Sequence, residues 1–94
     1  MSSIPQSLLR ERVRAFVGES FYVPDLAALD DGVSLVETGI VDSTGILEVI
    51  AFLEEQFHIQ VESDEATPGN LDSVHNIVAF LGRKLEPTST EMAA

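Results

Sequence analysis

Ser43 stands out in this sequence as a candidate for chemistry. It follows Asp42 at the start of a strongly apolar run, "GIVDSTGILEVIAFLEEQF", which extends from Gly39 to Phe57. A serine hydroxyl is a weak nucleophile until a positioned base or a metal activates it. No motif in the sequence indicates either a base or a metal for Ser43. By pattern alone, an Asp-Ser pair before an amphipathic helix is typical of an N-cap.

The other ionisable residues form no familiar catalytic arrangement. The chain has no GxGxxG, P-loop or HExxH motif. Glu54 and Glu55 are neighbours in sequence, so their carboxylates point in different directions around a helix. His58 and His75 lack the positioned partner that acid-base catalysis needs, and we interpret both as structural or exposed. We therefore expect no catalytic residue.

Metal binding is not expected either. Glu62, Asp64 and Glu65 lack the spacing of an EF-hand loop. The chain contains no cysteine, which removes thiolate ligands, disulfides and a cysteine nucleophile together. Its first residues, "MSSIPQSLLRERVRAF", do not resemble a signal peptide, and no segment approaches membrane-spanning length. We expect a cytoplasmic protein with no membrane partner.

The charges are distributed unevenly along the chain. The formal net charge is −11, and no Lys or Arg occurs between Ala15 and Gly82. A negative surface repels phosphate backbones and anionic lipids and attracts proteins with basic patches. We therefore expect protein partners and no nucleic acid, although an acidic surface also serves solubility alone. The basic residues are Arg10, Arg12, Arg14, Arg83 and Lys84.

Length and composition indicate one small folded domain. A chain of 94 residues can bury a single modest core, and a hydrophobic fraction of 45% favours folding despite the high charge. The segment "EPTSTEMAA" at the C-terminal end lacks apolar periodicity. We expect one domain over residues 1–86 and a flexible tail over residues 87–94.

Apolar periodicity predicts three long helices. The first runs from about Ile4 to Val17, with Ser3 in the arrangement of a capping box and Gly18 near its end. The second runs from about Ser43 to Phe57, and the last begins at Asp72. The apolar positions expected to converge on one core are Ile46, Ile50, Leu53, Val74, Ile77 and Leu81.

The connections between these helices differ in length. Residues 21–42 show no sustained helical period, and their scattered apolar residues favour a packed loop with a helical turn. A short helical turn is expected near Asp64 to Thr67. No strand pattern appears. The sequence therefore predicts an all-α fold, a small four-helix bundle with a long first loop and a short third helix.

The segment "LVETGIVDSTGILEVIAFLEEQFHIQV" resembles the central region of the acyl carrier proteins. In that family a loop leads to an Asp-Ser-Leu motif at the start of helix two, and Asp42 and Ser43 match its first two positions. The similarity extends more weakly over nearly the whole chain and implies a bundle of acyl carrier type. The helix-two pattern and its exit are matched by Glu48, Leu53, Glu54, Glu55, Phe57 and Ile59.

The resemblance implies that Ser43 carries a 4'-phosphopantetheine arm, transferred from coenzyme A by a separate phosphopantetheinyl transferase. The thiol of the arm would hold an acyl group as a thioester, so the protein would be a monomeric carrier and not an enzyme. No internal base is then needed, because another enzyme activates the hydroxyl.

Asp42 needs a separate explanation. The N-terminus of a helix favours a phosphodiester by ~0.3 to 1 kcal/mol, and repulsion from a carboxylate at about 4 Å costs ~1 kcal/mol in water. The two effects roughly cancel, so we interpret Asp42 as a helix cap or as a contact for the transferase.

The acidic face of the second helix is the expected docking surface. Thr44, Glu48 and Glu55 would meet acyl- or aminoacyl-activating ligase or synthase enzymes through basic patches. Thr44 and Gly45 depart from the family, which usually has leucine and then an acidic or polar residue there. This favours a specialised stand-alone carrier with a polar cargo, such as an aminoacyl group, that stays outside the helices. The alternative is an unmodified acidic adaptor in which Asp42 and Ser43 only cap the helix.

Overall fold

The structure is a computed structural model and describes residues 5–85. Within this range the chain forms four α-helices and no strand, so the predicted all-α fold is confirmed. In chain order the elements are α1 (Gln6–Ser20), the 3-10 turn η1 (Leu26–Ala28), α2 (Ser43–Phe57), α3 (Pro68–Leu71) and α4 (Val74–Lys84).

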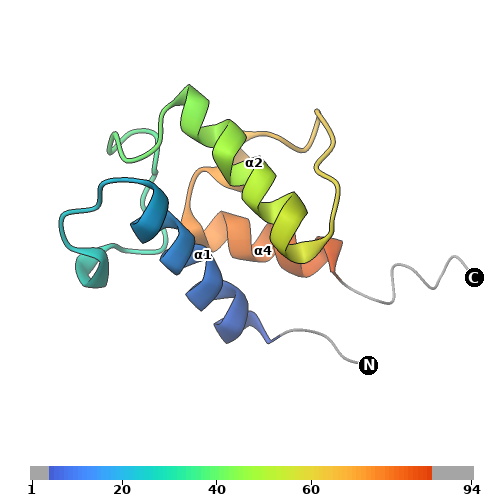
Figure 1. The fold of residues 1–94 in the computed structure, drawn as a ribbon, viewed down its shortest axis with the longest axis horizontal. Coiled ribbons are helices and arrows are strands. Elements are labelled where there is room, and N and C mark those ends of the chain that lie inside the picture. Colours follow the sequence, from blue (N-terminus) through green and yellow to red (C-terminus); the bar gives the residue numbers. More distant parts are fainter. Residues whose placement is uncertain (1–4, 86–94) are drawn as a thin grey trace, which may run out of the picture.

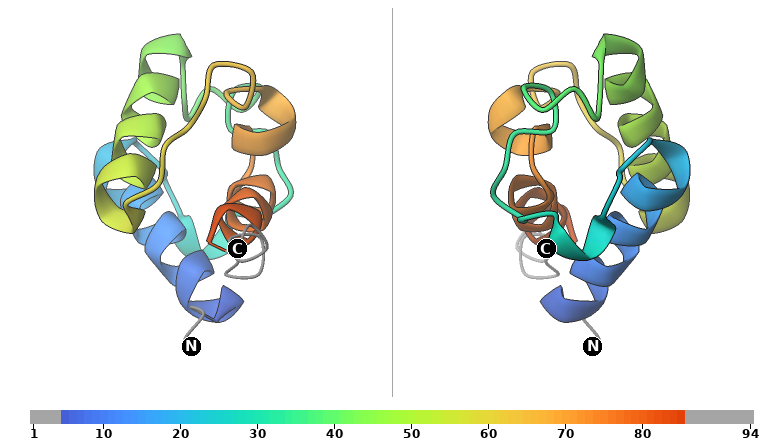
Figure 2. Two further views of the ribbon diagram at one scale, coloured as in Figure 1. Left: turned by 90° about the vertical axis from the view of Figure 1, so that its right-hand side faces the viewer. Right: turned by 90° about the vertical axis from the view of Figure 1, so that its left-hand side faces the viewer.

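The helices are arranged in two layers around the core. In Figure 2, α1 and α2 lie on one side of the molecule, while α3 and α4 lie on the other. The first turn of α2 lies at the opposite end of the molecule from the start of α1 (Figure 1). The arrangement therefore places Ser43, the first residue of α2, at one end of the bundle.

The core is built from apolar residues of all four helices and the first loop. The predicted core positions Leu53, Val74, Ile77 and Leu81 are buried, whereas Ile46 and Ile50 are half-buried and pack against the edge of the core. The remaining buried apolar residues are Leu9, Val13, Val17, Leu35, Val41, Val49, Phe57, Leu71, Val78 and Phe80.

Helix α1 differs from the prediction at both ends. It begins at Gln6 and continues past Gly18 to Ser20, with Pro5 in the capping position and no side-chain cap. The expected cap, Ser3, lies outside the described residues, as does Ile4. Gly18 does not end the helix. A side chain there would come within 2.8 Å of the Leu26 methyl group, so this glycine allows the first loop to pack closely.

The second half of the chain contains two further corrections. The short helix predicted at Asp64 to Thr67 is in fact α3, which begins at Pro68 because proline suits the first position of a helix. Helix α4 begins at Val74 and not at Asp72, because the Ser73 hydroxyl caps it by accepting a hydrogen bond from the Asn76 backbone N–H. The predicted tail, residues 87–94, lies outside the described residues.

The long first loop is packed, as predicted, and an arginine of α1 holds it in place. The Arg14 guanidinium donates hydrogen bonds to the Leu26 and Leu29 carbonyls and to Asp31. Arg10 also pairs with Asp31. Burial tends to raise the pKa of Asp31, but hydrogen bonds and attraction from the two arginines outweigh it and bring that pKa below its ordinary value. Two of the five basic residues thus pair with Asp31 of the first loop.

Candidate functional site

The first turn of α2 is organised by Asp42. This residue has extended backbone angles, and its carboxylate accepts a hydrogen bond from the Gly45 backbone N–H at 2.7 Å. Its carbonyl accepts the bond from the Ile46 N–H that begins the helix. Ser43 is the first helical residue and is exposed. The predicted cap is therefore confirmed for Asp42, and the Ser43 hydroxyl takes no part in it.

Close packing explains why position 45 is a glycine, and the sequence alone does not reveal this. It is buried, and a Cβ atom at this position would lie 2.8 Å from the Phe21 ring and 3.0 Å from a Val41 methyl group. Real Cβ atoms do not approach ring carbons so closely, so a larger residue would displace Phe21. The glycine lets this ring pack directly on the turn that carries Ser43.

A row of aromatic rings continues from this turn into the molecule. Phe21 meets Phe16 edge to face, with ring centroids 5.8 Å apart. Phe16 in turn stacks on Phe52 at 4.1 Å, which joins α1 to the middle of α2. Aromatic pairs of this kind contribute about 0.5 to 1.5 kcal/mol each beyond the area they bury. The start of α2 thus packs on Phe21, the residue that follows α1, and the Phe16–Phe52 stack joins the two helices further along.

The outer face of α2 is open to solvent. Thr44, Glu48 and Glu55 are all exposed, as is Ala51 between them. Leu47 is also 66% exposed, and it is the residue of this face that the sequence reasoning missed. A signal for it was present, because Leu47 falls outside the apolar stripe formed by Ile46, Val49 and Leu53. The structure therefore adds one large apolar side chain to an acidic surface.

The neighbouring glutamates and the histidines have ordinary structural surroundings. Glu54 is half-buried and accepts a hydrogen bond from the Val61 N–H at 3.0 Å, whereas Glu55 is exposed, as their sequence positions predict. His58 ends α2 in the left-handed conformation, and its N–H donates to the Glu54 carbonyl. His75 is exposed and donates its backbone N–H to the Asp31 carbonyl at 2.8 Å. These contacts support chain geometry and supply no acid-base pair.

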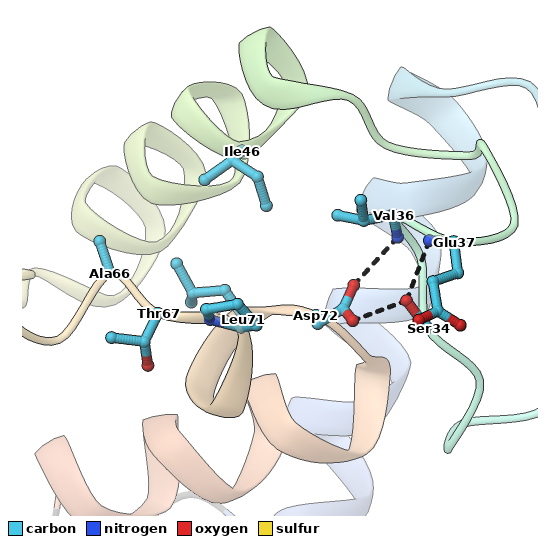
Figure 3. Close-up of a pocket in the computed structure, with 9 residues that line it drawn as sticks. Ser34, Val36, Glu37, Ile46, Ala66, Thr67, Leu71 and Asp72 are labelled. Carbon is cyan, nitrogen blue, oxygen red and sulfur yellow. Dashed lines mark hydrogen bonds between the residues drawn. The ribbon is translucent and has the colours of Figure 1, made fainter.

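A pocket of about 330 Å³ lies between the first loop, α2 and α3. Figure 3 shows Ile46 of α2 facing Val36 of the loop, with Leu71 of α3 below them. The remaining lining residues are Ser34, Glu37, Ala66, Thr67, Pro68 and Asp72. The pocket combines an apolar interior with polar groups on the loop side.

Asp72 holds the loop wall of this pocket. Its carboxylate accepts hydrogen bonds from the Ser34 hydroxyl at 2.6 Å and from the Val36 backbone N–H at 2.9 Å (Figure 3). Its backbone carbonyl accepts another from the Leu35 N–H at 2.6 Å. These bonds join segments far apart in sequence, which explains why the pocket was not predicted.

Between residues 5 and 85, no group of three or more His, Cys, Asp or Glu residues is arranged to hold a metal ion. None of the helices in the same range has the length and apolar character needed to cross a membrane.

A likeness to a known protein bears on the role of Ser43. No family model matches this chain. A protein described as the probable acyl carrier protein PigG, from Serratia sp. (strain ATCC 39006), is 26% identical to it over 76 residues. The matched region covers 81% of this chain and 87% of that protein. A similarity along most of both chains supports the family resemblance of the motif around Ser43.

Proposed function

We propose that this chain is a carrier protein in which Ser43 bears a 4'-phosphopantetheine arm. The arm would hold an acyl group as a thioester and present it to partner enzymes. The geometry at the start of α2 carries this proposal. Asp42 alone supplies the side-chain cap, so the exposed Ser43 hydroxyl has no capping role there. The likeness to a probable acyl carrier protein over most of the chain adds independent support.

The surroundings of Ser43 suit the attachment of a phosphodiester. Ser43 begins a helix of 15 residues, whose N-terminal dipole favours an anion. In the transfer, a bond forms between the Ser43 Oγ and the phosphorus that keeps the pantetheine, while the phosphoanhydride bond of coenzyme A breaks and adenosine 3',5'-bisphosphate leaves. The hydroxyl proton goes to a base of the transferase. The chain itself supplies an accessible hydroxyl on a packed helix turn.

Asp42 has two compatible roles in this proposal. Its carboxylate caps α2 through the Gly45 N–H, and it is exposed, so a transferase could also contact it. We assign it recognition of the transferase in addition to the cap. Replacement by asparagine would keep a capping oxygen and remove the charge, which separates the two roles.

The docking face for ligase or synthase partners is proposed to include Thr44, Glu48 and Glu55. All three are exposed on α2, and no Lys or Arg lies in the sequence between residues 15 and 82. A partner with a basic patch would therefore be attracted to this helix.

The cargo is proposed to be a polar acyl group such as an aminoacyl group. Thr44 and Gly45 both depart from the family pattern. Gly45 is explained by its packing against Phe21, so only Thr44 still favours specialised partners and a polar cargo. The pocket beside Ile46 is where a long apolar chain would shelter. A medium-chain acyl group that raised the thermal midpoint well above that of the unloaded holo form would contradict a polar cargo.

Intact mass after incubation with coenzyme A and a broad-specificity phosphopantetheinyl transferase tests the central proposal. The wild type should gain one arm, and Ser43→Ala should gain none while its circular dichroism is unchanged. Ser63→Ala, which removes an exposed serine elsewhere, is the matched control and should gain one arm. An unmodified wild type, or a modified Ser43→Ala, would overturn the carrier proposal and favour the unmodified adaptor.

A further inference from the structure

A second hollow, of about 350 Å³, lies between the exposed sides of α1 and α2. The stacked rings of Phe16 and Phe52 form its apolar lining. The remaining lining residues are Arg12, Ala15, Glu19 and Gln56. We infer that this hollow and the exposed side of α1 form the interface of a homodimer, in which a second copy packs its own α1 antiparallel to the first. The inference goes beyond the proposed function and does not depend on it.

The exposed side of α1 has the spacing of a helix–helix contact. Leu8, Arg12, Ala15 and Glu19 are all exposed and follow one another at intervals of four, three and four residues. This alternation keeps side chains along one seam that faces a partner helix. Ala15, in the middle of the seam, is small, and the distance between packed helix axes depends on the side chains at the contact. The seam therefore suits the close approach of another helix.

Arg12 and Glu19 indicate that the other helix is a second α1. They are seven residues apart, which places them about 10.5 Å apart along the helix axis. Within residues 5–85 neither of them forms an ion pair. When a second α1 packs antiparallel about a twofold axis near Ala15, each Arg12 faces Glu19 of the other copy, so the same pair forms twice. A parallel approach would bring like charges together.

The same axis also accounts for two exposed apolar side chains. Leu8 is 40% exposed near the start of α1, and Tyr22 is 82% exposed two residues after its end. In the antiparallel pair, Leu8 of one copy lies opposite the segment of the other copy that contains Tyr22. Two apolar contacts then flank the two ion pairs, as a self-complementary interface requires.

The distribution of charge limits where two copies can meet. A formal net charge of −11 makes most surfaces of the chain repel a second copy. Of the five basic residues, four bond to side chains of their own chain, and among residues 5–85 Arg12 has no such contact. The seam that contains Arg12 is therefore where charge favours self-association. The family resemblance implies a monomer, and the homodimer replaces that expectation.

Sedimentation equilibrium of the full chain, up to millimolar concentration, tests the homodimer. The wild type should form a dimer and no larger species, because a twofold interface closes on itself. Arg12→Glu and Glu19→Arg should each raise the dissociation constant of the dimer about tenfold, equivalent to about 1.4 kcal/mol. The double variant exchanges the two charges and keeps the net charge, so it should return to within about threefold of the wild type.

Asp64→Arg is the matched control, because it makes the same change in net charge as Glu19→Arg at an exposed residue outside the hollow and the seam. Both variants are less negative than the wild type, so a response to net charge alone would strengthen association in both. The homodimer instead requires weaker association in Glu19→Arg only. Thermal melting checks that each variant retains the fold.

A wild type that stays monomeric would overturn the homodimer and leave this face to another protein. A dimer that the single reversals do not weaken, or that the double variant does not recover, would have its interface elsewhere and would also overturn the inference. The mass gained at Ser43 is measured separately, so none of these outcomes decides the carrier proposal.

Discussion

Helices α2 and α4 share one apolar pattern but meet their surroundings differently. Helix α4 buries five residues over 11 positions, and the basic residues of its last turn are engaged by neighbours. Lys84 pairs with Glu65, and Arg83 donates to the Asn70 side chain. Helix α2 buries four residues over 15 positions and contains no basic residue at all. One helix is enclosed, and the other keeps an open face.

Because of this difference, the two faces of α2 have separate roles: the inner face stabilises the fold, and the outer face is available for the proposed function. The inner stripe of α2 serves the core, as α4 does, through Val49, Leu53 and Phe57. The outer face of α2 makes no ion pair within the described residues. Surface substitutions away from caps and packing usually change stability by less than about 0.5 kcal/mol. The outer face can therefore vary in response to partners without loss of the fold.

The largest expected effect tests whether the buried faces of α2 and α4 contribute equally to the free energy of unfolding. Leu53 and Leu81 both have 0% of their surface exposed. Leu53→Ala and Leu81→Ala should each lower the free energy of unfolding by about 2 to 5 kcal/mol, measured by denaturant titration. Leu47→Ala, on the open face of α2, should change it by less than about 0.5 kcal/mol.

An unequal result would contradict this part of the comparison. If Leu53→Ala cost little while Leu81→Ala unfolded the domain, α2 would be a peripheral helix and not a wall of the core. The start of α2 would then be less firmly positioned than its packing indicates.

The two helices also contain one glycine each. Replacing these glycines by alanine should change the stability of the fold in opposite directions. Gly45→Ala would bring a methyl group against Phe21 and should cost about 1 to 3 kcal/mol. At Gly82 the nearest atom would be 3.8 Å away, so Gly82→Ala should stabilise by up to about 1 kcal/mol. Thermal melting of both variants measures the difference.

A double-mutant cycle identifies the cause of the Gly45 effect. In a Phe21→Ala background, Gly45→Ala should cost less, because the ring that it displaces is absent. Equal costs in both backgrounds would show that Phe21 packing is not the reason for glycine at this position.

The sequence predicted α2 best because the signals for that helix are local. The apolar period and the Asp42 cap lie within the helix or beside it, and the predicted bounds, Ser43 to Phe57, agree with the structure. Helix α3 was misplaced, since Thr67 and Pro68 mark its start more reliably than the acidic residues before them. The prediction of a short helix depends on such single residues, because a helix of about one turn shows no apolar periodicity.

Features that depend on contacts between distant residues could not be predicted in the same way. The Ser34–Asp72 hydrogen bond joins residues 38 positions apart, and the packing of Phe21 on Gly45 likewise requires the fold. The place of Ser43 before an apolar helix marks it as a candidate residue, but its proposed modification depends on the family resemblance. Side-chain geometry then added that Asp42 alone forms the cap.

A smaller effect is expected from charge on the open face of α2. Glu48→Lys and Glu55→Lys should each weaken the encounter with a partner that loads the arm by about 0.2 to 1 kcal/mol, seen as a slower loading rate. Higher salt should reduce the same rate in the wild type. Glu11→Lys makes the same change in net charge on α1 and is the control. Rates that respond equally to all three reversals would show that net charge, and not this face, attracts the partner.

The smallest effect concerns the ion pair at the enclosed end of α4. A hydrogen bond from the Glu62 backbone N–H, followed by one from Lys84, lowers the pKa of Glu65 below its ordinary value of 4.5. A carboxylate with a lowered pKa in the folded state contributes stability above its unfolded pKa. That contribution is lost as the pH falls through the lowered value. Glu65→Gln should therefore reduce the thermal midpoint slightly at neutral pH, and the difference should narrow on acidification.

Glu55→Gln provides the control on the open helix, because it removes one negative charge from an exposed residue outside this ion pair. Its midpoint should stay close to that of the wild type across the same pH range. Since both variants change the net charge equally, a shift seen only in Glu65→Gln reports the local bonds to Glu62 and Lys84. Parallel curves for the two variants would mean that α4 gains no more from its charged neighbours than α2 does.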